Sequence, residues 1–571
     1  MNNKEVARLL WDVADLLELK AENRFKIVAY RKAARSIESM KEDLETVWRR
    51  GELKAIPGVG KAIAQNIEEY LTTGKVEIHE QLVAGTPPGL VELLKISGLG
   101  PKTIFRLHEE LNVSSIEDLE RMAREHRVRR LSRMGPASEN NILKAIERYK
   151  KRSTRIPLGV AAPIVEEILN HLRGIEGLDN LSVAGSFRRG RDTVGDLDLL
   201  ATSSHPQEVI KAFLEMSMVE EVLAKGVTKT SVIVNETIQV DLRIVAHQSF
   251  GTVMQYFTGS KEHNVKLRGI ALSKGYSLSE YSLTRLSNGE ELFFDNEEDL
   301  YAQLGFPYIS PELREDQGEI EAAIAGNLPQ LVALSDVKGD LHVHSDWSDG
   351  RNSILELIDA AKALGYEYLS ITDHSPGLGI ANGLSEDRLL DKIAYISELN
   401  ESLEDFTILA GTEVDIRADG RLDYSDDVLS KCDLVIAAVH SAHNQPSRLM
   451  TKRIIQAIEN EHVDVIAHPT GRIIGQRDPY DVEMDLVLDA ATRTETIMEI
   501  NAHPNRLDLN DLWSKEAKER GVKMAINSDA HSLEGLKVMR YGIKTARRGW
   551  LEPKDVVNTL ELKDLYSYIN D

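Results

Sequence analysis

Short apolar runs alternate with longer stretches of helical periodicity in the last part of the chain. Seven such runs lie between Val337 and Ser532, and those at 368–372 and 434–439 are almost continuous in apolar residues. Strands buried on both faces have this pattern, which is typical of a parallel sheet covered by helices. The seven strand-helix units predict a distorted (β/α)7 barrel with the helices outside.

The preceding parts of the chain have other patterns. Apolar positions three and four residues apart, as in 6–17, predict amphipathic helices through the first 155 residues. The middle part mixes helices with apolar strands that carry aspartates near 196 and 241. A chain of 571 residues is too long for one core, so the sequence predicts a multidomain protein with α+β and α/β parts.

Composition narrows the class of protein. The sequence has no apolar run of 18 residues and no basic-then-apolar leader at its start, so we expect a cytoplasmic protein that does not enter a membrane. The single cysteine, Cys432, excludes disulfides within the chain and metal sites built from several cysteines.

Charge is distributed unevenly along the chain. The net charge is −23, but residues 1–155 contain 29 Lys and Arg against 23 Asp and Glu. The basic residues concentrate at 121–130 and 148–155. Lys and Arg clusters are the usual contacts to nucleic-acid phosphates, so this segment is the one suited to bind DNA.

Two glycine turns occur in the same basic segment. Each lies between an apolar residue and a helical stretch, and a weaker third copy surrounds Gly135. Glycines permit a tight turn and let a phosphate approach backbone N–H groups at a helix N-terminus. One such turn is often only a helical hairpin, but two copies about 40 residues apart resemble tandem helix-hairpin-helix motifs. The resemblance implies DNA contacts at Gly58, Gly60, Gly98 and Gly100.

His, Asp or Glu residues follow the apolar runs of the last part. Eight of the nine histidines beyond residue 337 follow a predicted strand, and the carboxyl ends of barrel strands meet in one pocket. Any one of them alone would more often be a buried histidine bonded to a backbone carbonyl. Because imidazole and carboxylate are ligands for zinc, manganese and iron, the whole set predicts a metal cluster.

These motifs resemble the PHP (polymerase and histidinol phosphatase) family of metal-dependent phosphoesterases, over about 235 residues. The resemblance implies a trinuclear site and Mn²⁺-stimulated 3′-to-5′ exonuclease activity, with cleavage at abasic sites or cleaning of 3′ ends as additional reactions. A small-molecule phosphatase of the histidinol-phosphate type would use the same ligands, so that alternative stays open. The implied ligands are His342, His344, Glu413 and Asp529 for one ion; Glu413, His440 and His468 for a second; and Asp349, His374 and His531 for a third.

Three aspartates in the middle of the chain predict a second metal site. Asp196 and Asp198 are two residues apart on an apolar strand and therefore share one face. Asp241 lies on another apolar strand and can supply a third carboxylate. Such an all-oxygen site suits a pair of Mg²⁺ or Mn²⁺ ions about 4 Å apart, as used for in-line phosphoryl transfer.

With Gly185-Ser186 upstream, this region resembles the nucleotidyltransferases, and specifically the family X DNA polymerases of the polymerase beta type, from about Lys4 to Phe306. The resemblance implies that Asp196, Asp198 and Asp241 are catalytic. It also implies contacts to the triphosphate of a dNTP from Arg155, Gly185, Ser186, Arg189 and Gly195, contacts to its sugar from Tyr256, Phe257 and Gly259, and contacts to the base pair from Asn264 and Arg268.

The match to this family is incomplete at the lyase site. Where the family has the lysine that forms a Schiff base at an abasic site, the chain has Asn66, whose amide cannot be that nucleophile. Lys26 matches a basic contact to a DNA phosphate.

Together the two resemblances imply a polymerase that fills short gaps during base excision repair, acts on gapped or primed DNA and dNTPs, and carries a nuclease in the same chain. We separately expect a monomer. The middle part could instead be a degenerate scaffold that only binds DNA, although its three intact aspartates argue against this. The expected domains are a helical lyase-like domain (1–85), helical fingers (86–155), a nucleotidyltransferase palm (156–255), a thumb (256–320) and a PHP barrel (337–571).

Overall fold

A computed structural model describes residues 3–19, 22–38, 40, 44–73, 76–84, 89–93, 96, 99–132, 134–153, 155–226, 228–235 and 237–570. The chain forms two compact units, Met1–Thr154 and Arg155–Asp571. Within the described part of the chain, no helix is both long and apolar enough to cross a membrane.

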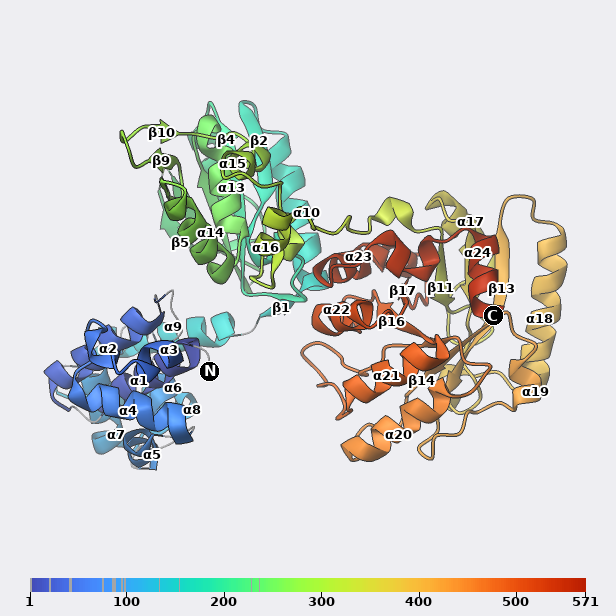
Figure 1. Cartoon of the computed structure of the whole chain (residues 1–571), viewed down its shortest axis with the longest axis horizontal. Helices are drawn as coiled ribbons and strands as arrows, with labels where there is room; N and C mark the ends of the chain where they lie inside the picture. Colours follow the sequence, from blue (N-terminus) through green and yellow to red (C-terminus); the bar gives the residue numbers. More distant parts are fainter. Residues whose placement is uncertain are drawn as a thin grey trace. The chain divides into compact units, whose positions relative to one another are not determined.

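The first unit is helical (Figure 1), and its described residues form two hydrophobic cores. One core runs from Val6 to Leu82 and the other from Leu90 to Ile146. A 3-10 turn precedes the helix in both the first and the third glycine turn, η1 before α4 and η2 before α9. Its elements are α1 (Asn3–Leu19), α2 (Arg24–Glu38), α3 (Leu44–Arg49), η1 (Leu53–Ala55), α4 (Lys61–Thr73), α5 (Glu77–Ala84), α6 (Leu90–Leu93), α7 (Pro101–Leu111), α8 (Ile116–Arg124), η2 (Val128–Arg130) and α9 (Pro136–Ser153).

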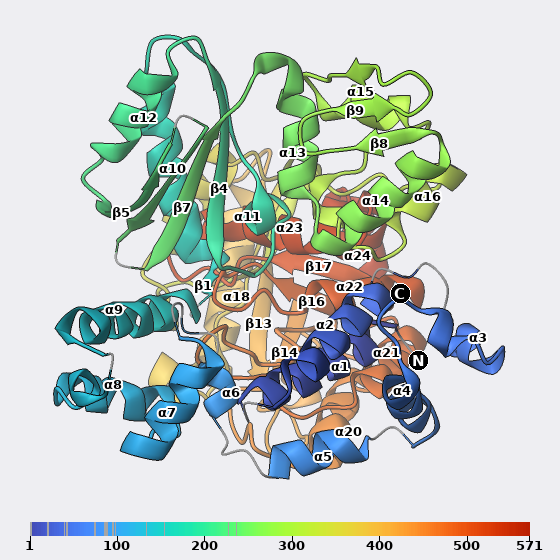
Figure 2. The same ribbon diagram turned by 90° about the vertical axis from the view of Figure 1, so that its left-hand side faces the viewer.

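The second unit begins with a five-stranded sheet in the order β2-β4-β7-β6-β5 (Figure 2). Apolar residues at alternate positions of β4 and β7, such as Leu199 and Leu242, face a core shared with α10 and α12. The intervening positions face the other side, where α11 and α13 pack against β4. The elements are β1 (Ile156–Pro157), α10 (Leu158–Arg173), β2 (Leu178–Val183), α11 (Gly185–Arg188), β3 (Thr193–Val194), β4 (Asp196–Ser203), α12 (Pro206–Leu214), β5 (Val219–Lys225), β6 (Lys229–Val234), β7 (Ile238–Ile244), η3 (His247–Ser249) and α13 (Phe250–Thr258).

A small α/β segment follows and has its own core around Leu267, Leu283 and Tyr301. Arg314 is fully buried beneath this core and pairs with Glu297. The elements are α14 (Lys261–Ser273), β8 (Tyr276–Leu278), β9 (Leu283–Arg285), β10 (Glu291–Leu292), α15 (Glu297–Gln303), η4 (Pro311–Leu313) and α16 (Glu319–Ala325), with η5 (Leu334–Asp336) leading into the last part.

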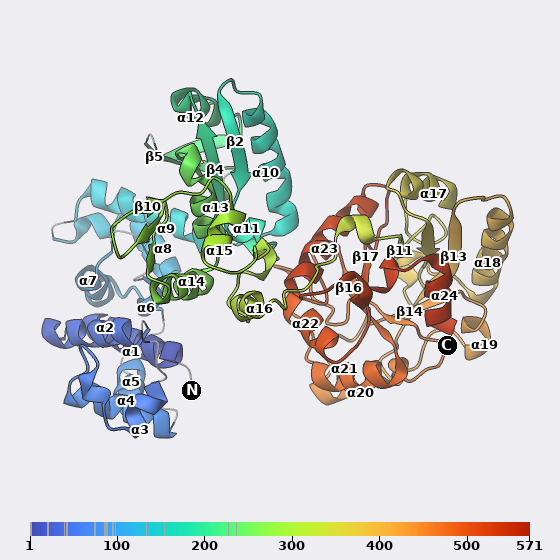
Figure 3. The same ribbon diagram turned by 45° about the horizontal axis from the view of Figure 1, so that its top comes forward.

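The last part is a parallel seven-stranded sheet whose strands follow chain order, which confirms the predicted barrel. A bridge between Val343 and Ala530 joins the first and last strands and nearly closes it. Outer helices, including α18, α20, α21 and α23, surround the strands (Figures 1 and 3). The elements are β11 (Gly339–Val343), α17 (Ile354–Ala363), β12 (Tyr368–Ile371), η6 (Gly379–Ala381), α18 (Glu386–Glu401), β13 (Thr407–Asp415), α19 (Asp426–Leu429), β14 (Leu434–Ala438), α20 (Ser447–Ile458), β15 (Val465–Ile466), α21 (Met484–Thr494), β16 (Ile497–Asn501), α22 (Asp511–Glu519), β17 (Met524–Asn527), η7 (Gly535–Val538), α23 (Met539–Arg548), η8 (Pro553–Asp555), η9 (Val557–Thr559) and α24 (Leu562–Asn570).

Two hydrophobic layers hold the barrel together. The outer layer packs the strands against the surrounding helices. The inner layer includes Leu341, Tyr368 and Leu434, and α24 contributes Leu565 to it. Since Tyr368 and Leu434 begin their strands, α24 covers the amino end of the barrel and leaves the carboxyl end for chemistry.

Candidate active sites

The carboxyl end of the barrel gathers the nine predicted metal ligands. The donor atoms of eight of them form three overlapping groups, and the ninth, His468, joins through its contact with Glu413. The buried end of the cluster contains His342 and His344, both fully inaccessible to solvent, whereas about a third of the side chains of Asp349 and His531 is exposed. A substrate would therefore approach from the Asp349 side. The groups are His342, His344 and Asp529; His374, Glu413 and His440; and His344, Asp349, His374 and His531.

Glu413 lies at the centre of the cluster and faces a different set of histidines with each oxygen. Its Oε2 lies 3.5 Å from His342 Nε2 and 3.6 Å from His344 Nε2. Its Oε1 lies 3.2 Å from His440 Nε2 and 3.1 Å from His468 Nε2. A carboxylate in this position can bridge two ions, as the first and second predicted ligand sets require.

The spacing of the donor atoms fits a shared ion. His342 Nε2 and His344 Nε2 lie 3.7 and 3.3 Å from Asp529 Oδ1. Ligands about 2.1 Å from one tetrahedral ion are about 3.4 Å apart, close to these separations. Both histidine nitrogens are buried and make no hydrogen bond of ordinary geometry within the described part of the chain. Because buried polar atoms are almost always satisfied, these two are suited to hold a metal ion.

The histidines of the cluster favour the ionised form of its two central carboxylates, Glu413 and Asp529. Burial opposes ionisation of Glu413, but His440, His374 and His342 outweigh it and hold its pKa well below the usual range. Burial likewise opposes ionisation of Asp529, and His342 and His344 outweigh it and lower its pKa. Both carboxylates are therefore charged at neutral pH.

A second carboxylate, Glu499, orients two of the ligands. Its Oε1 accepts a hydrogen bond from His342 Nδ1 at 2.7 Å, and its Oε2 accepts one from the backbone N–H of His468 at 2.7 Å. The first bond places the proton of His342 on Nδ1 and leaves Nε2 free to face the cluster. Glu499 ends a predicted strand like the ligands, but the sequence did not reveal this supporting role.

Lys392 and Asp373 form a second support that the sequence did not reveal. Lys392 Nζ donates to Asp373 Oδ2 at 3.1 Å, and both side chains are fully buried. Asp373 also accepts from the backbone N–H and the hydroxyl of Ser345, next to His344. A lysine among the apolar positions of α18, between Leu389 and Ile396, is the signal that could have identified this pair.

Three further residues that follow barrel strands, Arg472, His443 and Arg506, have different partners, and Arg506 pairs with the predicted ligand Asp529. Arg472 donates to Asp192 Oδ2 at 3.1 Å and to two backbone carbonyls, so it contacts the palm rather than the cluster. His443 stacks on Tyr480, and Arg506 Nε lies 3.8 Å from Asp529 Oδ2.

The second site lies on the five-stranded sheet. β4 and β7 are parallel neighbours, and the register pairs Asp198 directly with Asp241. Asp196 precedes Asp198 by two residues on the same face. The structure therefore brings the three predicted carboxylates together on the face opposite α10 and α12.

The three carboxylates repel one another, so added positive charge would stabilise the site. Burial, Asp196 and Asp241 raise the pKa of Asp198 to about 7, and burial and Asp241 raise that of Asp196. Burial opposes ionisation of Asp241, but hydrogen bonds from Lys229 and Gln239 outweigh it and lower its pKa. Lys229 Nζ lies 2.6 Å from Asp241 Oδ2, a contact for which the sequence gives no signal. Divalent cations would relieve the repulsion among the carboxylates, so these residues fit a metal pair.

The residues predicted to hold the triphosphate surround this face. Gly185 begins α11 at φ +65°, and a Cβ there would lie 2.8 Å from Asp198 Oδ2. Ser186 follows it in α11. Arg155 Nε donates to Thr193 Oγ1 at 2.9 Å, beside Gly195.

The guanidinium of Arg189 forms hydrogen bonds with Glu315 and with the backbone at Thr258. Its Nε donates to Glu315 Oε1 at 2.9 Å, and its Nη1 donates to the carbonyl of Thr258 at 2.7 Å.

The residues predicted to contact the sugar lie at the end of α13, and those predicted to contact the base lie in α14. The rings of Tyr256 and Phe257 meet edge to face, with an interplanar angle of 75°. Asn264 is buried and uses its amide to donate to the carbonyls of Tyr256 and Gly259, so it holds this turn. Gly259 packs so closely that a Cβ would lie 2.5 Å from Asn264 Oδ1. Arg268 Nε donates to the carbonyl of Asn264 at 3.3 Å, and the base contacts of both residues stay predictions.

The glycines of the first unit differ in whether the structure has room for a side chain. Gly58 has φ +90° and lies so close to α2 that a Cβ would sit 2.8 Å from Ala33 N. Gly60 and Gly100 face open space at the starts of α4 and α7, where a backbone could approach a phosphate. Lys26 is exposed on α2. Gly98 lies outside the described residues.

Asn66 has a structural role. Its Nδ2 donates to the hydroxyl of the buried Tyr30 at 2.6 Å. An amide that holds a core tyrosine is consistent with the absence of the lyase nucleophile at this position.

Five family models match the chain. The first unit matches a helix-hairpin-helix domain (residues 1–76) and a SAM-like helix-hairpin-helix tandem (90–148). The second unit matches the DNA polymerase beta palm (155–268), the DNA polymerase beta thumb (253–315) and the PHP domain (340–503).

Individual relatives agree with this division. The DNA polymerase/3′-5′ exonuclease PolX of Bacillus subtilis (strain 168) is 43% identical over 572 residues, covering 100% of this chain and 99% of the relative. A probable phosphatase of Thermoanaerobacter sp. (strain X514) is 32% identical over 232 residues, 38% of this chain and 89% of the relative. DNA polymerase lambda of Arabidopsis thaliana is 26% identical over 347 residues, 55% of this chain and 62% of the relative.

Proposed function

Because this chain belongs to the family X DNA polymerases that carry a PHP domain, we propose that it fills short gaps in DNA and trims 3′ ends with its barrel. The observation that carries the proposal is the presence of two separate carboxylate sites in one unit. Asp196, Asp198 and Asp241 form one, and the cluster around Glu413 forms the other.

At the palm, Asp241 would orient the primer 3′-OH, and Asp196 and Asp198 would hold the ions that bind the triphosphate. Two divalent ions, Mg²⁺ or Mn²⁺, would supply charge neutralisation for in-line displacement. Ser186, Arg189 and Arg155 would hold the triphosphate, and Tyr256 and Phe257 would line the sugar. Arg155 and Arg189 stabilise the charged form of Asp196, and Gly185, next to Ser186, packs against Asp198, so the positions of these residues support the triphosphate roles.

At the barrel, the nine ligands would hold three ions, for which Zn²⁺, Mn²⁺ and Fe²⁺ are all chemically suitable. The ions would activate water and neutralise charge on the phosphate. Glu499 and the Asp373–Lys392 pair would keep His342 and the segment around His344 in place. Cleavage at abasic sites or removal of 3′ blocking groups would be further reactions at this site.

The rival function for the barrel is hydrolysis of a small phosphomonoester. The match to a probable phosphatase, confined to 38% of this chain, favours it. Fusion to a polymerase and to helix-hairpin-helix domains favours DNA instead.

We further propose that the first unit grips the DNA backbone through its glycine turns, in a cytoplasmic monomer. The domains expected from the sequence, 1–85, 86–155, 156–255, 256–320 and 337–571, are part of this proposal.

A substrate comparison tests the barrel assignment. His342→Ala and wild type are given a labelled DNA 3′ end and, separately, a phosphomonoester in Mn²⁺. We expect wild type to shorten DNA and the variant to lose that activity. Shortening by the variant, or turnover of the phosphomonoester without DNA cleavage by wild type, would overturn the assignment.

A further inference from the structure

Helix α23 of the barrel carries three arginines that form ion pairs with the palm and thumb. Arg540 pairs with Glu166 of α10, Arg547 with Glu312 of η4, and Arg548 with Glu315. The first pair is about half exposed, whereas the side chain of Arg548 is 3% exposed. Burial of a guanidinium is costly unless all its donors are used, so the Arg548 contact is the most constrained of the three.

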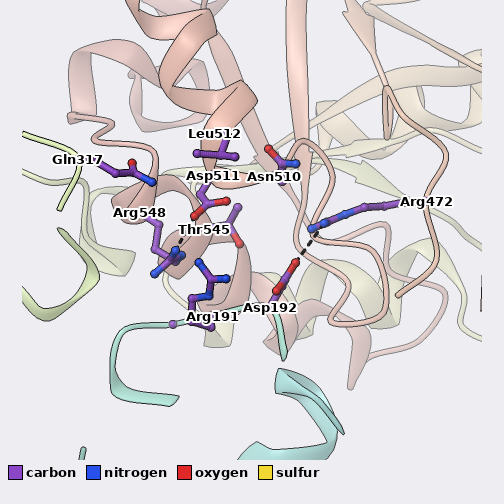
Figure 4. A pocket seen from close by; sticks show the side chains of 10 residues that line it. Arg191, Asp192, Gln317, Arg472, Asn510, Asp511, Leu512, Thr545 and Arg548 are labelled. Carbon is purple, nitrogen blue, oxygen red and sulfur yellow. Dashed lines mark hydrogen bonds and ion pairs between the residues drawn. The ribbon is translucent and has the colours of Figure 1, made fainter. Parts of the chain in front are cut away.

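Arg548 is bound on both sides. Its Nη2 donates to Asp511 Oδ2 at 2.6 Å within the barrel, as Figure 4 shows. Its Nη1 donates to Glu315 Oε1 at 2.9 Å and to the backbone carbonyl of Arg189 at 3.0 Å. A barrel residue therefore contacts the main chain of a residue proposed to bind the nucleotide.

Glu315 connects the two arginines. The same Oε1 that accepts from Arg548 accepts from Arg189 Nε at 2.9 Å, and Arg191 Nη1 lies 3.8 Å away. Burial opposes ionisation of Glu315, but Arg189 and Arg548 outweigh it and lower its pKa. This shared, mostly buried carboxylate fixes the side chain of Arg189 relative to α23.

The contacts of Arg189 determine where it can bind a phosphate. Hydrogen bonds within the described part of the chain use its Nε, on Glu315, and its Nη1, on the carbonyl of Thr258. The Nη2 group is left for a phosphate oxygen, and the planar guanidinium directs it from these two fixed bonds. Preorganisation of this kind improves ligand affinity because the side chain is not ordered at the moment of binding.

A cavity next to Arg548 lies where the palm, the thumb and the barrel meet. It has a volume of about 260 Å³ and is lined by residues of all three parts, including Arg191 and Asp192 of the palm, Gln317 of the thumb, and Arg472 and Arg548 of the barrel. Figure 4 shows these side chains around it, with Asp192 paired to Arg472. The loop that follows Arg189 is thus held by the barrel at two points.

We propose that Arg548 and Glu315 are positioning residues for Arg189, so that the barrel domain completes the dNTP site of the polymerase. The inference rests on the proposed role of Arg189 in binding the triphosphate. The nuclease domain thereby sets the affinity of the polymerase for nucleotide without contacting the nucleotide itself.

Steady-state extension of a gapped duplex by the full-length protein tests this inference. Arg548→Ala should raise the KM for dNTP about tenfold, the effect of losing hydrogen bonds to a charged group, with kcat and the KM for DNA nearly unchanged. Arg548→Lys should recover part of the affinity, because one ammonium cannot satisfy all three acceptors. Arg540→Ala and Arg547→Ala are matched controls on the same helix, and neither should change the KM for dNTP.

Two further variants separate the possible failures. Arg189→Ala should raise the KM for dNTP more than Arg548→Ala, and the double variant should resemble Arg189→Ala alone, since residues that act through one another are not additive. If Arg189→Ala has no effect, the proposed role of Arg189 is wrong. If Arg189→Ala acts but Arg548→Ala does not, or if all three α23 variants raise KM alike, the positioning role is wrong. Retained shortening of 3′ ends by Arg548→Ala shows that the barrel is folded.

Discussion

Replacement of Glu499 by glutamine should weaken metal binding at the barrel without changing its shape. Within the described part of the chain, the Glu499 carboxylate accepts four hydrogen bonds and donates none. His342 Nδ1 and Asn527 Nδ2 donate to Oε1 at 2.7 and 3.0 Å, and His468 N and Asn501 Nδ2 donate to Oε2 at 2.7 and 3.3 Å. Glutamine accepts with only one of its two terminal atoms, so two of these donors would face an N–H group.

Either orientation of the glutamine disturbs a ligand. An amide nitrogen near His342 would favour the tautomer with the proton on Nε2, which cannot bind a metal through that atom. An amide nitrogen on the other side would repel the backbone N–H of His468. Loss of such a supporting group lowers metal affinity about 10–100-fold, or about 1.4–2.7 kcal/mol.

The assay is the shortening of a labelled 3′ end across a Mn²⁺ titration. For Glu499→Gln the Mn²⁺ midpoint should rise about 10–100-fold, with a rate near wild type at saturating metal. Primer extension at the palm should be unchanged. Glu461→Gln, an exposed position remote from the cluster, is the matched control. An unchanged midpoint for Glu499→Gln would refute the orienting role, and a rate that no metal concentration restores would indicate a misfolded barrel instead.

Three other perturbations test separate parts of the account. Lys392→Met leaves Asp373 buried without its ammonium partner and should cost about 3–5 kcal/mol. On heating, 3′-end shortening should be lost before primer extension at saturating dNTP, and simultaneous loss of both would contradict this prediction. Gly58→Ala, at φ +90° and against α2, should destabilise the first unit by about 1–3 kcal/mol, whereas Gly60→Ala should not, as followed by thermal unfolding and by DNA-binding anisotropy; equal unfolding of the two variants would be evidence against the turn geometry. Borohydride treatment with abasic DNA should trap no adduct on the wild-type chain, because Asn66 cannot form a Schiff base, and a trapped adduct would identify another lysine as a lyase nucleophile.

The sequence predicted the barrel and the convergence of the candidate ligands at its rim, because strand periodicity and parallel topology together fix which strand ends meet. The assignment of ligands to individual ions stays a prediction, and His374 lies as close to Glu413 and His440 as to Asp349 and His531. The apolar run at 463–467 forms only the short strand Val465–Ile466, yet His468 still reaches the rim. The same reasoning placed Asp196 and Asp198 on one face, and the register with β7 brings Asp241 beside them.

Contacts between distant segments could not be predicted in this way. Glu315 and Arg548 are 233 residues apart, and neither periodicity nor charge pattern indicates that they meet. Lys229 reaches Asp241 only because β6 pairs with β7 in the observed register. The sequence also did not indicate that the amide of Asn264 holds the turn after α13; its predicted base contact stays a prediction.

Extension and shortening of a labelled primer on a one-nucleotide gapped duplex, with and without dNTPs in Mn²⁺, test the central claim most directly. Asp198→Ala should abolish extension and retain shortening, and His344→Ala should do the reverse. That result would establish two independent sites with the roles given above. If His344→Ala still shortened the primer, the barrel would not be the nuclease, and the account of its metal cluster as a DNA-processing site would be contradicted.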